Sequence, residues 1–209
     1  MESIKKNQLK NNAITVAKKY QFEEKHCLHV AKLALSLFDQ LSHLHQLTPQ
    51  ERNILEAATI LHDIGWIKGQ QKHHKLAQEL IINSQRLKVS LKVRILIGLI
   101  ARYHRKSLPQ NSHKYFSQLN KISKKNVKIL ASFLRIADGL DRMHQSSVEN
   151  ILCKNTSKQI ILRLIGKNII EEDINIAREK ADLLKIVFKK PVKILRTNRS
   201  FLSHQRNCT

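Results

Sequence analysis

Glycine and proline are scarce in this chain of 209 residues, which has five Gly and three Pro. So few turn-forming residues exclude a turn-rich sandwich or barrel and favour long helices. No apolar run approaches the roughly 20 residues that a membrane-spanning helix needs. The polar N-terminus also lacks the apolar core of a signal peptide. We therefore expect a cytoplasmic, mainly α-helical protein.

Cysteines, aromatic residues and acidic residues are also few. The three cysteines, Cys27, Cys153 and Cys208, are odd in number and far apart, as is typical of free thiols in a reducing compartment. Aromatic residues make up 5% of the chain, which leaves few stacking platforms for single-stranded nucleic acid. Lys and Arg number 38 against 16 Asp and Glu, a formal charge of +22. This excess predicts attraction to polyanions, but it does not identify a reaction.

Apolar residues recur at helical spacing in most of the chain and in short β-branched runs near its end. Helices are predicted over residues 23–44, 48–65, 76–83, 89–106 and 127–143. The last of these is apolar on nearly every side and should lie at the centre of a bundle. Strands are predicted over 148–153, 159–165 and 191–195, with a helix over 171–188. We therefore predict a helical domain (1–146), a small β-β-α-β module (147–196) and a basic tail (197–209).

The dipeptide His62-Asp63 lies near the C-terminal end of the second predicted helix. An aspartate in a last turn faces the negative end of the helix dipole, which is unfavourable unless a cation lies nearby. His26, His104 and Asp138 each lie one turn from a core-facing apolar residue, so they should point inward and need partners. Imidazole nitrogens and carboxylate oxygens suit Mn, Fe, Zn or Mg. A shared divalent metal would satisfy these groups together.

Taken singly, each of these residues has a simpler explanation. A buried histidine often bonds a backbone carbonyl, and a buried aspartate often pairs with Lys or Arg. The joint occurrence on separate helices favours the metal. Asp141 is expected to pair with Arg142 or a lysine rather than to bind the metal. Surface positions are expected for His43, His45, His113, His144 and His204.

The order His26, His62-Asp63, Asp138 resembles the H…HD…D signature of the HD superfamily. The segments Ala101-Arg-Tyr-His-Arg-Lys106 and Leu134-Arg-Ile-Ala-Asp-Gly-Leu-Asp141 resemble the C-terminal HD region of the exopolyphosphatase/guanosine pentaphosphate phosphohydrolase (Ppx/GppA) family, as does His26 to Gln40. The resemblance implies an HD-type helical bundle followed by a small αβ module. Polyphosphate hydrolysis in that family belongs to N-terminal actin-like domains, for which we expect no room in this chain.

The resemblance also implies which residues bind metal. One ion would be held by His26, His62, Asp63 and Asp138. Family members often read His-Lys-His-Ser where this chain has His74-Lys75-Leu76-Ala77, and the second histidine of that motif is a ligand in two-metal enzymes. We therefore expect one metal ion. A second would have to use His73, His74 or His104.

The function predicted from these features is metal-dependent phosphate hydrolysis, in which a metal-bound hydroxide attacks phosphorus. The substrate would be a nucleotide, guanosine penta- or tetraphosphate, or polyphosphate. Asp63 would orient the water, and His104 would donate a proton to the leaving oxygen or bind a second metal. Phosphate-binding cations, or otherwise a solvated basic face, would be Arg102, Arg105, Lys106, Arg135 and Arg142. The alternative is a non-catalytic module that keeps the metal site and binds polyphosphate or RNA, and a homodimer is left open.

Overall fold

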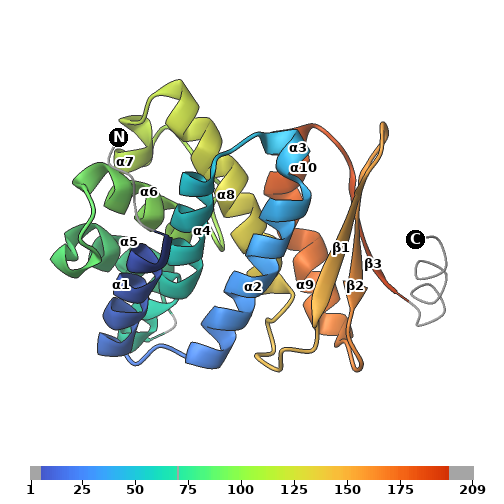
Figure 1. The fold of residues 1–209 in the computed structure, drawn as a ribbon, viewed down its shortest axis with the longest axis horizontal. Coiled ribbons are helices and arrows are strands. Elements are labelled where there is room, and N and C mark those ends of the chain that lie inside the picture. The colour runs from blue at the N-terminus through green and yellow to red at the C-terminus, as the bar shows by residue number, and fades with distance from the viewer. Residues whose placement is uncertain (1–5, 70, 198–209) are drawn as a thin grey trace.

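The computed structural model describes residues 6–69 and 71–197, which form a helical bundle followed by a small sheet (Figure 1). The bundle contains α1 (Lys6–Lys19), α2 (Glu24–Gln40), α3 (Ser42–His45), α4 (Pro49–Leu61), α5 (His73–Asn83), α6 (Leu91–Arg102), α7 (Lys114–Ser117) and α8 (Lys121–Gly139). Two short 3-10 helices are η1 (Ile64–Lys68) and η2 (Gln85–Leu87). After the bundle come β1 (Asn150–Asn155), β2 (Ile160–Ile165), α9 (Glu171–Lys180), α10 (Asp182–Phe188) and β3 (Val192–Arg196). The mainly helical fold with a small αβ module is confirmed.

Several helix boundaries differ from the predicted ones. The helix expected over 23–44 is interrupted at Leu41, so that α3 forms a separate turn. Helix α1 is not among the predicted helices, although its apolar positions repeat at helical spacing and its apolar face packs on α4. Helix α8 begins at Lys121, six residues earlier than expected, because the Asn120 side chain accepts the N–H of Ser123 and caps it.

The centre of the bundle is α8, as its all-round apolar pattern predicted. Its residues from Ile129 to Gly139 are buried. Helices α2, α4 and α6 pack on it from the bundle, and α9 and α10 pack on it from the C-terminal module. Figure 1 shows α9 and α10 between α8 and the sheet. Elements far apart in the sequence therefore meet along α8.

The C-terminal module follows the predicted β-β-α-β order along the chain, except that the helix predicted over 171–188 is divided into α9 and α10. β1 pairs with β2 antiparallel, and β2 pairs with β3 in parallel, with α9 and α10 forming the crossover between them. The inward residues of β2, Ile160, Leu162 and Leu164, belong to the same apolar core as the bundle. The predicted boundary near residue 146 lies in the loop before β1, but the core is continuous across it.

Three remaining expectations concern thiols, membrane spans and the tail. Cys27 and Cys153 are free thiols, as predicted, whereas Cys208 lies outside the described residues. Among the helices described, none combines the length and apolarity that crossing a bilayer would take. The predicted basic tail, with His204, falls beyond the described residues except for Thr197.

Candidate metal centre

The four predicted ligands converge in the middle of the bundle. His26 comes from α2, His62 and Asp63 follow α4, and Asp138 comes from α8. His62 Nε2 lies 3.5 Å from Asp63 Oδ2 and 3.4 Å from Asp138 Oδ1. His26 Nε2 lies 3.9 Å and 3.7 Å from the same two oxygens. One donor atom from each residue lies within 4.8 Å of the others, so these residues can hold a metal ion.

Hydrogen bonds at the outer nitrogen fix how three of the imidazoles are oriented. His62 Nδ1 donates to Thr59 O at 2.7 Å, His104 Nδ1 donates to Ala101 O at 2.7 Å, and His26 Nδ1 donates to Asp141 Oδ2 at 2.8 Å. These oxygens only accept, so in the neutral ring each Nδ1 carries the hydrogen and each Nε2 offers its lone pair to the centre. Metal-binding histidines are usually held in this way.

The role of Asp141 differs from the prediction. Its expected partner was Arg142 or a lysine, but one carboxylate oxygen accepts from His26 Nδ1 and the other accepts from the backbone N–H of Ser146 at 2.6 Å. Asp141 is completely buried. It therefore orients a candidate ligand instead of neutralising a surface cation.

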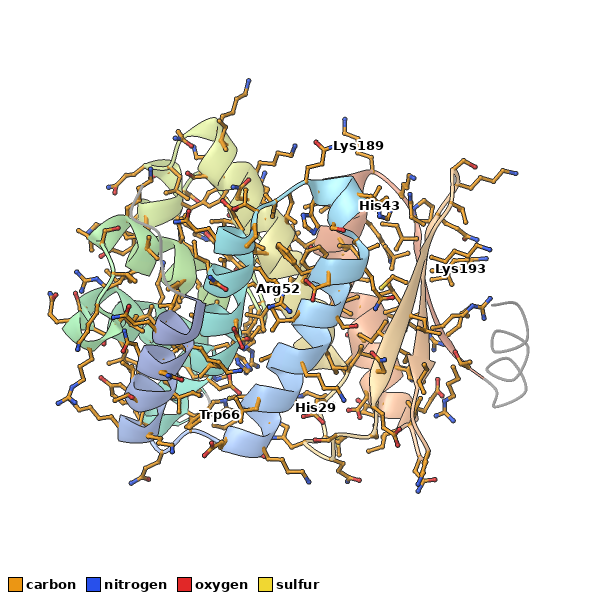
Figure 2. The ribbon with its side chains drawn as sticks, viewed as in Figure 1. His29, His43, Arg52, Trp66, Lys189 and Lys193 are labelled. Atoms are coloured by element: carbon orange, nitrogen blue, oxygen red, sulfur yellow. The ribbon has the colours of Figure 1, made fainter. Side chains whose placement is uncertain are left out.

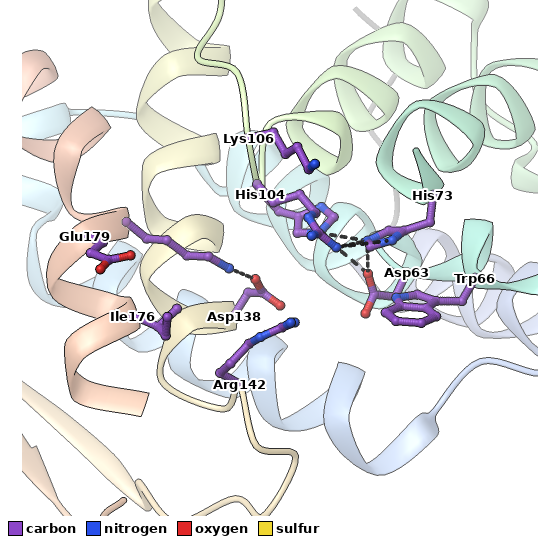
Figure 3. Close-up of a pocket in the computed structure, with 11 residues that line it drawn as sticks. Asp63, Trp66, His73, His104, Lys106, Asp138, Arg142, Ile176 and Glu179 are labelled. Carbon is purple, nitrogen blue, oxygen red and sulfur yellow. Dashed lines mark hydrogen bonds and ion pairs between the residues drawn. The ribbon is translucent and has the colours of Figure 1, made fainter. Parts of the chain in front are cut away.

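A second group of donor atoms shares Asp63 with the first. His73 Nε2 lies 3.3 Å and His104 Nε2 lies 3.6 Å from Asp63 Oδ1, and the two nitrogens are 3.4 Å apart (Figure 3). Asp63 thus presents Oδ2 to the first group and Oδ1 to the second. His74 belongs to neither group among the residues described. His73 is therefore the residue of this segment that contributes a donor atom to the centre.

Helix α5 explains why His73 rather than His74 or Leu76 reaches the centre. The helix begins at His73, three residues earlier than predicted, and Leu76 lies one turn further on, half-buried. The close approach of α5 to η1 depends on Gly65, because a Cβ there would collide with the carbonyl oxygen of His73. The glycine after His62-Asp63 therefore permits the packing that brings His73 beside Asp63.

The charges at the centre favour a cation. Burial alone would raise the pKa of Asp63, but the nearby His62, His73 and His104 lower it by more. The resulting pKa of Asp63 therefore lies below the usual range. Burial would lower the pKa of His62, yet the two carboxylates outweigh it and raise that pKa well above its ordinary value. The position near His62 Nε2 therefore attracts positive charge, which a proton or a metal ion can supply.

The donor atoms also fit a metal ion in number and spacing. A tetrahedral ion with bonds of about 2.1 Å separates its ligands by roughly 3.4 Å, close to the shortest separations here. The Nε2 atoms of His26 and His62 are buried and have no hydrogen-bond partner within the described part of the chain. Buried polar atoms without partners are rare in proteins. A divalent cation at this point would satisfy both.

A cavity of about 210 Å³ opens on the centre, and we call it the metal cavity (Figure 3). Asp63, His73, His104 and Asp138 line it on one side. The cationic side chains that line it are Arg105, Lys106, Arg142 and Lys180. A space of this size accommodates a phosphate group rather than a whole drug-sized ligand, which needs about 300 Å³ or more.

Two of the predicted phosphate-binding cations are engaged elsewhere. Arg135 is buried and donates to both carboxylate oxygens of Asp182, at 3.0 and 2.8 Å, and to Tyr103 O at 3.0 Å. Arg102 donates to Gln78 Oε1 at 2.8 Å. Neither lines the metal cavity, whereas Arg105, Lys106 and Arg142 do.

Lys180 was not among the residues that the sequence singled out. It comes from α9 of the small module, and its ammonium group forms an ion pair with Asp138 (Figure 3). Helix α9 comes close enough because Gly139 has no side chain, and a Cβ there would lie 2.9 Å from Ala177 Cα. The sequence places Lys180 three residues after Ala177, on the same side of one helix, but the packing of that helix on α8 is known only from the structure.

Two further aromatic contacts surround the centre. Trp66 stacks on His73 with ring centroids 4.9 Å apart. His144, expected at the surface, is half-buried and stacks on His26 with centroids 3.8 Å apart, and its Nδ1 lies 2.6 Å from Glu23 Oε2. His45 was also expected at the surface but is buried. These positions follow from long-range packing that helical periodicity alone does not reveal.

Comparison with known proteins agrees with this geometry. The model of the family described as Ppx/GppA phosphatase, domain III, matches residues 10–183. No curated protein matches the chain. The matched segment includes every candidate ligand and Lys180. The resemblance noted in the sequence is therefore confirmed, and the chain belongs to the Ppx/GppA phosphatase domain III family.

Proposed function

We propose that this protein is a metal-dependent phosphohydrolase of phosphate-rich substrates, such as a nucleotide, guanosine penta- or tetraphosphate, or polyphosphate. The observation that carries the proposal is the pair of inward-facing Nε2 atoms, on His26 and His62, which are buried without partners beside two carboxylates. A purely structural core gives no reason for such an arrangement, because each unpaired polar atom destabilises the fold.

His26, His62, Asp63 and Asp138 would hold one divalent ion, of Mn, Fe, Mg or Zn. The geometry also supports a second ion at Asp63, His73 and His104. When bound, such ions act as Lewis acids on phosphoryl oxygen and lower the pKa of water towards neutrality. Burial lowers the pKa of His104 well below its ordinary value, so its ring is neutral. This supports a ligand role for His104 rather than the role of proton donor.

The remaining groups of the metal cavity would bind the substrate. Arg105, Lys106 and Arg142 would donate charge-assisted hydrogen bonds to phosphate oxygens, and Lys180 adds a fourth cation. Asp63, which lies between the two donor groups, would orient the attacking water. In the reaction the water oxygen bonds to phosphorus, the phosphorus–oxygen bond to the leaving group breaks, and a proton from water ends on the leaving oxygen.

Phosphate release with Mn²⁺ from a panel of nucleotides, guanosine penta- and tetraphosphate, and polyphosphate tests this proposal. The wild type should hydrolyse at least one of them, and His62→Ala should abolish that activity together with metal binding. His45→Ala is the matched control, because His45 is buried outside the centre. Activity that survives His62→Ala would come from a contaminating enzyme. A metal-loaded wild type that hydrolyses none of the panel would contradict the proposal.

One observation favours a second candidate, a non-catalytic module that binds polyphosphate or RNA. Four lysines of α8, together with Phe116, line a cavity of about 470 Å³ on the far end of that helix from Asp138. The cavity lies in a chain of net charge +22. Lysines grouped in this way bind polyanions through counterion release. Steeply salt-dependent binding of polyphosphate or RNA, without hydrolysis, would favour this candidate.

A further inference from the structure

A second cavity adjoins the metal cavity, and we call it the aromatic cavity. It has a volume of about 530 Å³ and is lined by Tyr20, Phe22, Trp66 and Ile67, among others. Asp63 and Trp66 line both cavities. A ligand that fills the aromatic cavity therefore has one end at the metal centre. Its volume falls in the range of about 300–1,000 Å³ that is usual for small-molecule sites.

Aromatic side chains gather here although they are scarce in the chain. The sequence has one Trp, three Tyr and six Phe, and three of these ten residues line the aromatic cavity. Trp66 is 40% exposed, and the neighbouring Ile67 is 53% exposed. Figure 2 shows the position of Trp66 in the fold. Large apolar side chains that stay exposed next to a site often mark the place of a ligand.

The charges of the two cavities differ. Four cations line the metal cavity, whereas none of the described residues that line the aromatic cavity is Lys or Arg. Its charged lining consists instead of the carboxyl groups of Glu23 and Asp63. The aromatic cavity is therefore unsuited to a second phosphate and suited to an uncharged ring.

The walls of the aromatic cavity are held in place by the metal centre. One wall is Trp66, which stacks on His73. His144 also lines the cavity, stacks on His26 and pairs with Glu23. A ring bound in this cavity would have aromatic partners already in position, and their polar groups could bond its edge.

We propose that the aromatic cavity binds the nucleobase of a nucleoside phosphate whose phosphate lies in the metal cavity. The inference rests on the proposed function and narrows it, because inorganic polyphosphate has no part that fits the aromatic cavity. The nucleoside would be the leaving group. Water would supply the oxygen that bonds to phosphorus and the proton that ends on the ribose oxygen.

Tryptophan fluorescence tests the proposal directly, because Trp66 is the chain's one tryptophan. Adenosine should quench it saturably even with EDTA present, and AMP should do so with Mg²⁺. Tripolyphosphate with Mg²⁺ should bind, as calorimetry would show, with little quenching. Excitation at the red edge of the indole band avoids absorption by the base.

Phe22→Ala should raise the Kd of AMP by about tenfold, the usual contribution of one stacked base. The Kd of tripolyphosphate should change less than twofold. Ile67→Ala is a second variant that removes an exposed side chain, and Ile122→Ala, at a position 72% exposed, is its matched control. Circular dichroism establishes that each variant is folded.

Adenosine that leaves Trp66 unquenched, or an AMP affinity unaffected by both Phe22→Ala and Ile67→Ala, would overturn the inference. Metal content and tripolyphosphate hydrolysis, measured separately, would be unaffected by that failure. Conversely, loss of the metal-centre proposal would leave adenosine quenching in EDTA intact. The two failures are therefore distinguishable.

Discussion

Two buried histidines, His45 in α3 and His62 after α4, differ in what their ring nitrogens contact. In His45, Nε2 donates to Phe38 O at 2.8 Å and Nδ1 accepts the backbone N–H of Leu47 at 2.9 Å. In His62 only Nδ1 has a hydrogen-bond partner, and Nε2 faces the carboxylates of Asp63 and Asp138. Protein groups alone therefore satisfy both ring nitrogens of His45. The centre at His62 is complete only when a cation is added.

The comparison shows that burial does not distinguish a structural histidine from a ligand. Both side chains are buried, and both belong to the same bundle, one in α3 and the other directly after α4. The distinguishing feature is the number of ring nitrogens that protein groups satisfy. Four predictions test this difference, and they begin with the largest effect.

The number of metal ions bound by variants should show that the two groups of donor atoms each hold one ion. Purified wild type loaded with Mn²⁺ should bind two ions, His73→Ala one, and Asp63→Ala none, because Asp63 belongs to both groups. Activity should fall by roughly 10³-fold in Asp63→Ala, since Lewis-acid stabilisation contributes several kcal/mol. Atomic absorption after gel filtration measures the ions. Asp63→Ala protein that retains metal would contradict the assignment of the metal to this centre.

His45→Ala should lower the free energy of unfolding without affecting metal content. It leaves Phe38 O and the Leu47 N–H without their partner, which should cost about 3 kcal/mol. Urea unfolding in EDTA measures the change. His43→Ala, at the exposed neighbouring position, should change stability by less than about 0.5 kcal/mol. Equal stability of the two variants would contradict a structural role for His45.

Asp141→Asn should weaken metal binding about 10- to 100-fold, because the amide lacks the charge that holds His26 in its binding orientation. The matched control is Asp173→Asn, a second buried carboxylate, which accepts from Met143 N and Ser147 Oγ away from the ligands. That variant should alter stability but not metal affinity. Calorimetric titration with Mn²⁺ measures the metal affinity of each variant. Equal affinities for the two variants would mean that Asp141 does not act through His26.

The last prediction concerns pH. Burial, with help from His73 and Arg105, lowers the pKa of His74 to about 4 from its ordinary 6.5. Below pH 6.5, His74 therefore binds a proton in the unfolded chain but not in the folded chain. The free energy of unfolding decreases for this reason as the pH falls towards 4. The loss amounts to at most about 1.4 kcal/mol per pH unit. His74→Gln should remove this part of the slope in urea unfolding with EDTA, and an unchanged slope would contradict it.

The sequence predicted much of the fold because its signals are local. The capping box at Thr48 and Glu51 starts α4 where expected, and the β-branched runs give β1 and β2 within two residues. The early start of α5 places His73 against Gly65 of η1, a contact with another element. Local propensity does not record such contacts.

For the candidate site too, features that depend on single helices could be predicted, whereas features that depend on contacts between elements could not. His26, His62, Asp63 and Asp138 converge as predicted, because His26 and Asp138 are buried residues of α2 and α8 and His62 and Asp63 directly follow α4. Lys180 and the pairing of Asp141 with His26 could not be read from one helix, since the partners lie 42 and 115 residues apart. The pairing of Arg135 with Asp182 could not be read from one helix either, because Asp182 belongs to the other module.

The separation between His26 and Asp138 along the chain has a consequence for how the protein matures. No fragment of the chain that ends before α8 contains the complete ligand set, because Asp138 lies near the end of that helix. An ion held at this centre would therefore be bound with full affinity only after the whole bundle has assembled, and its uptake would report that assembly is complete. A nascent or truncated chain would carry the same histidines and still remain an apoprotein.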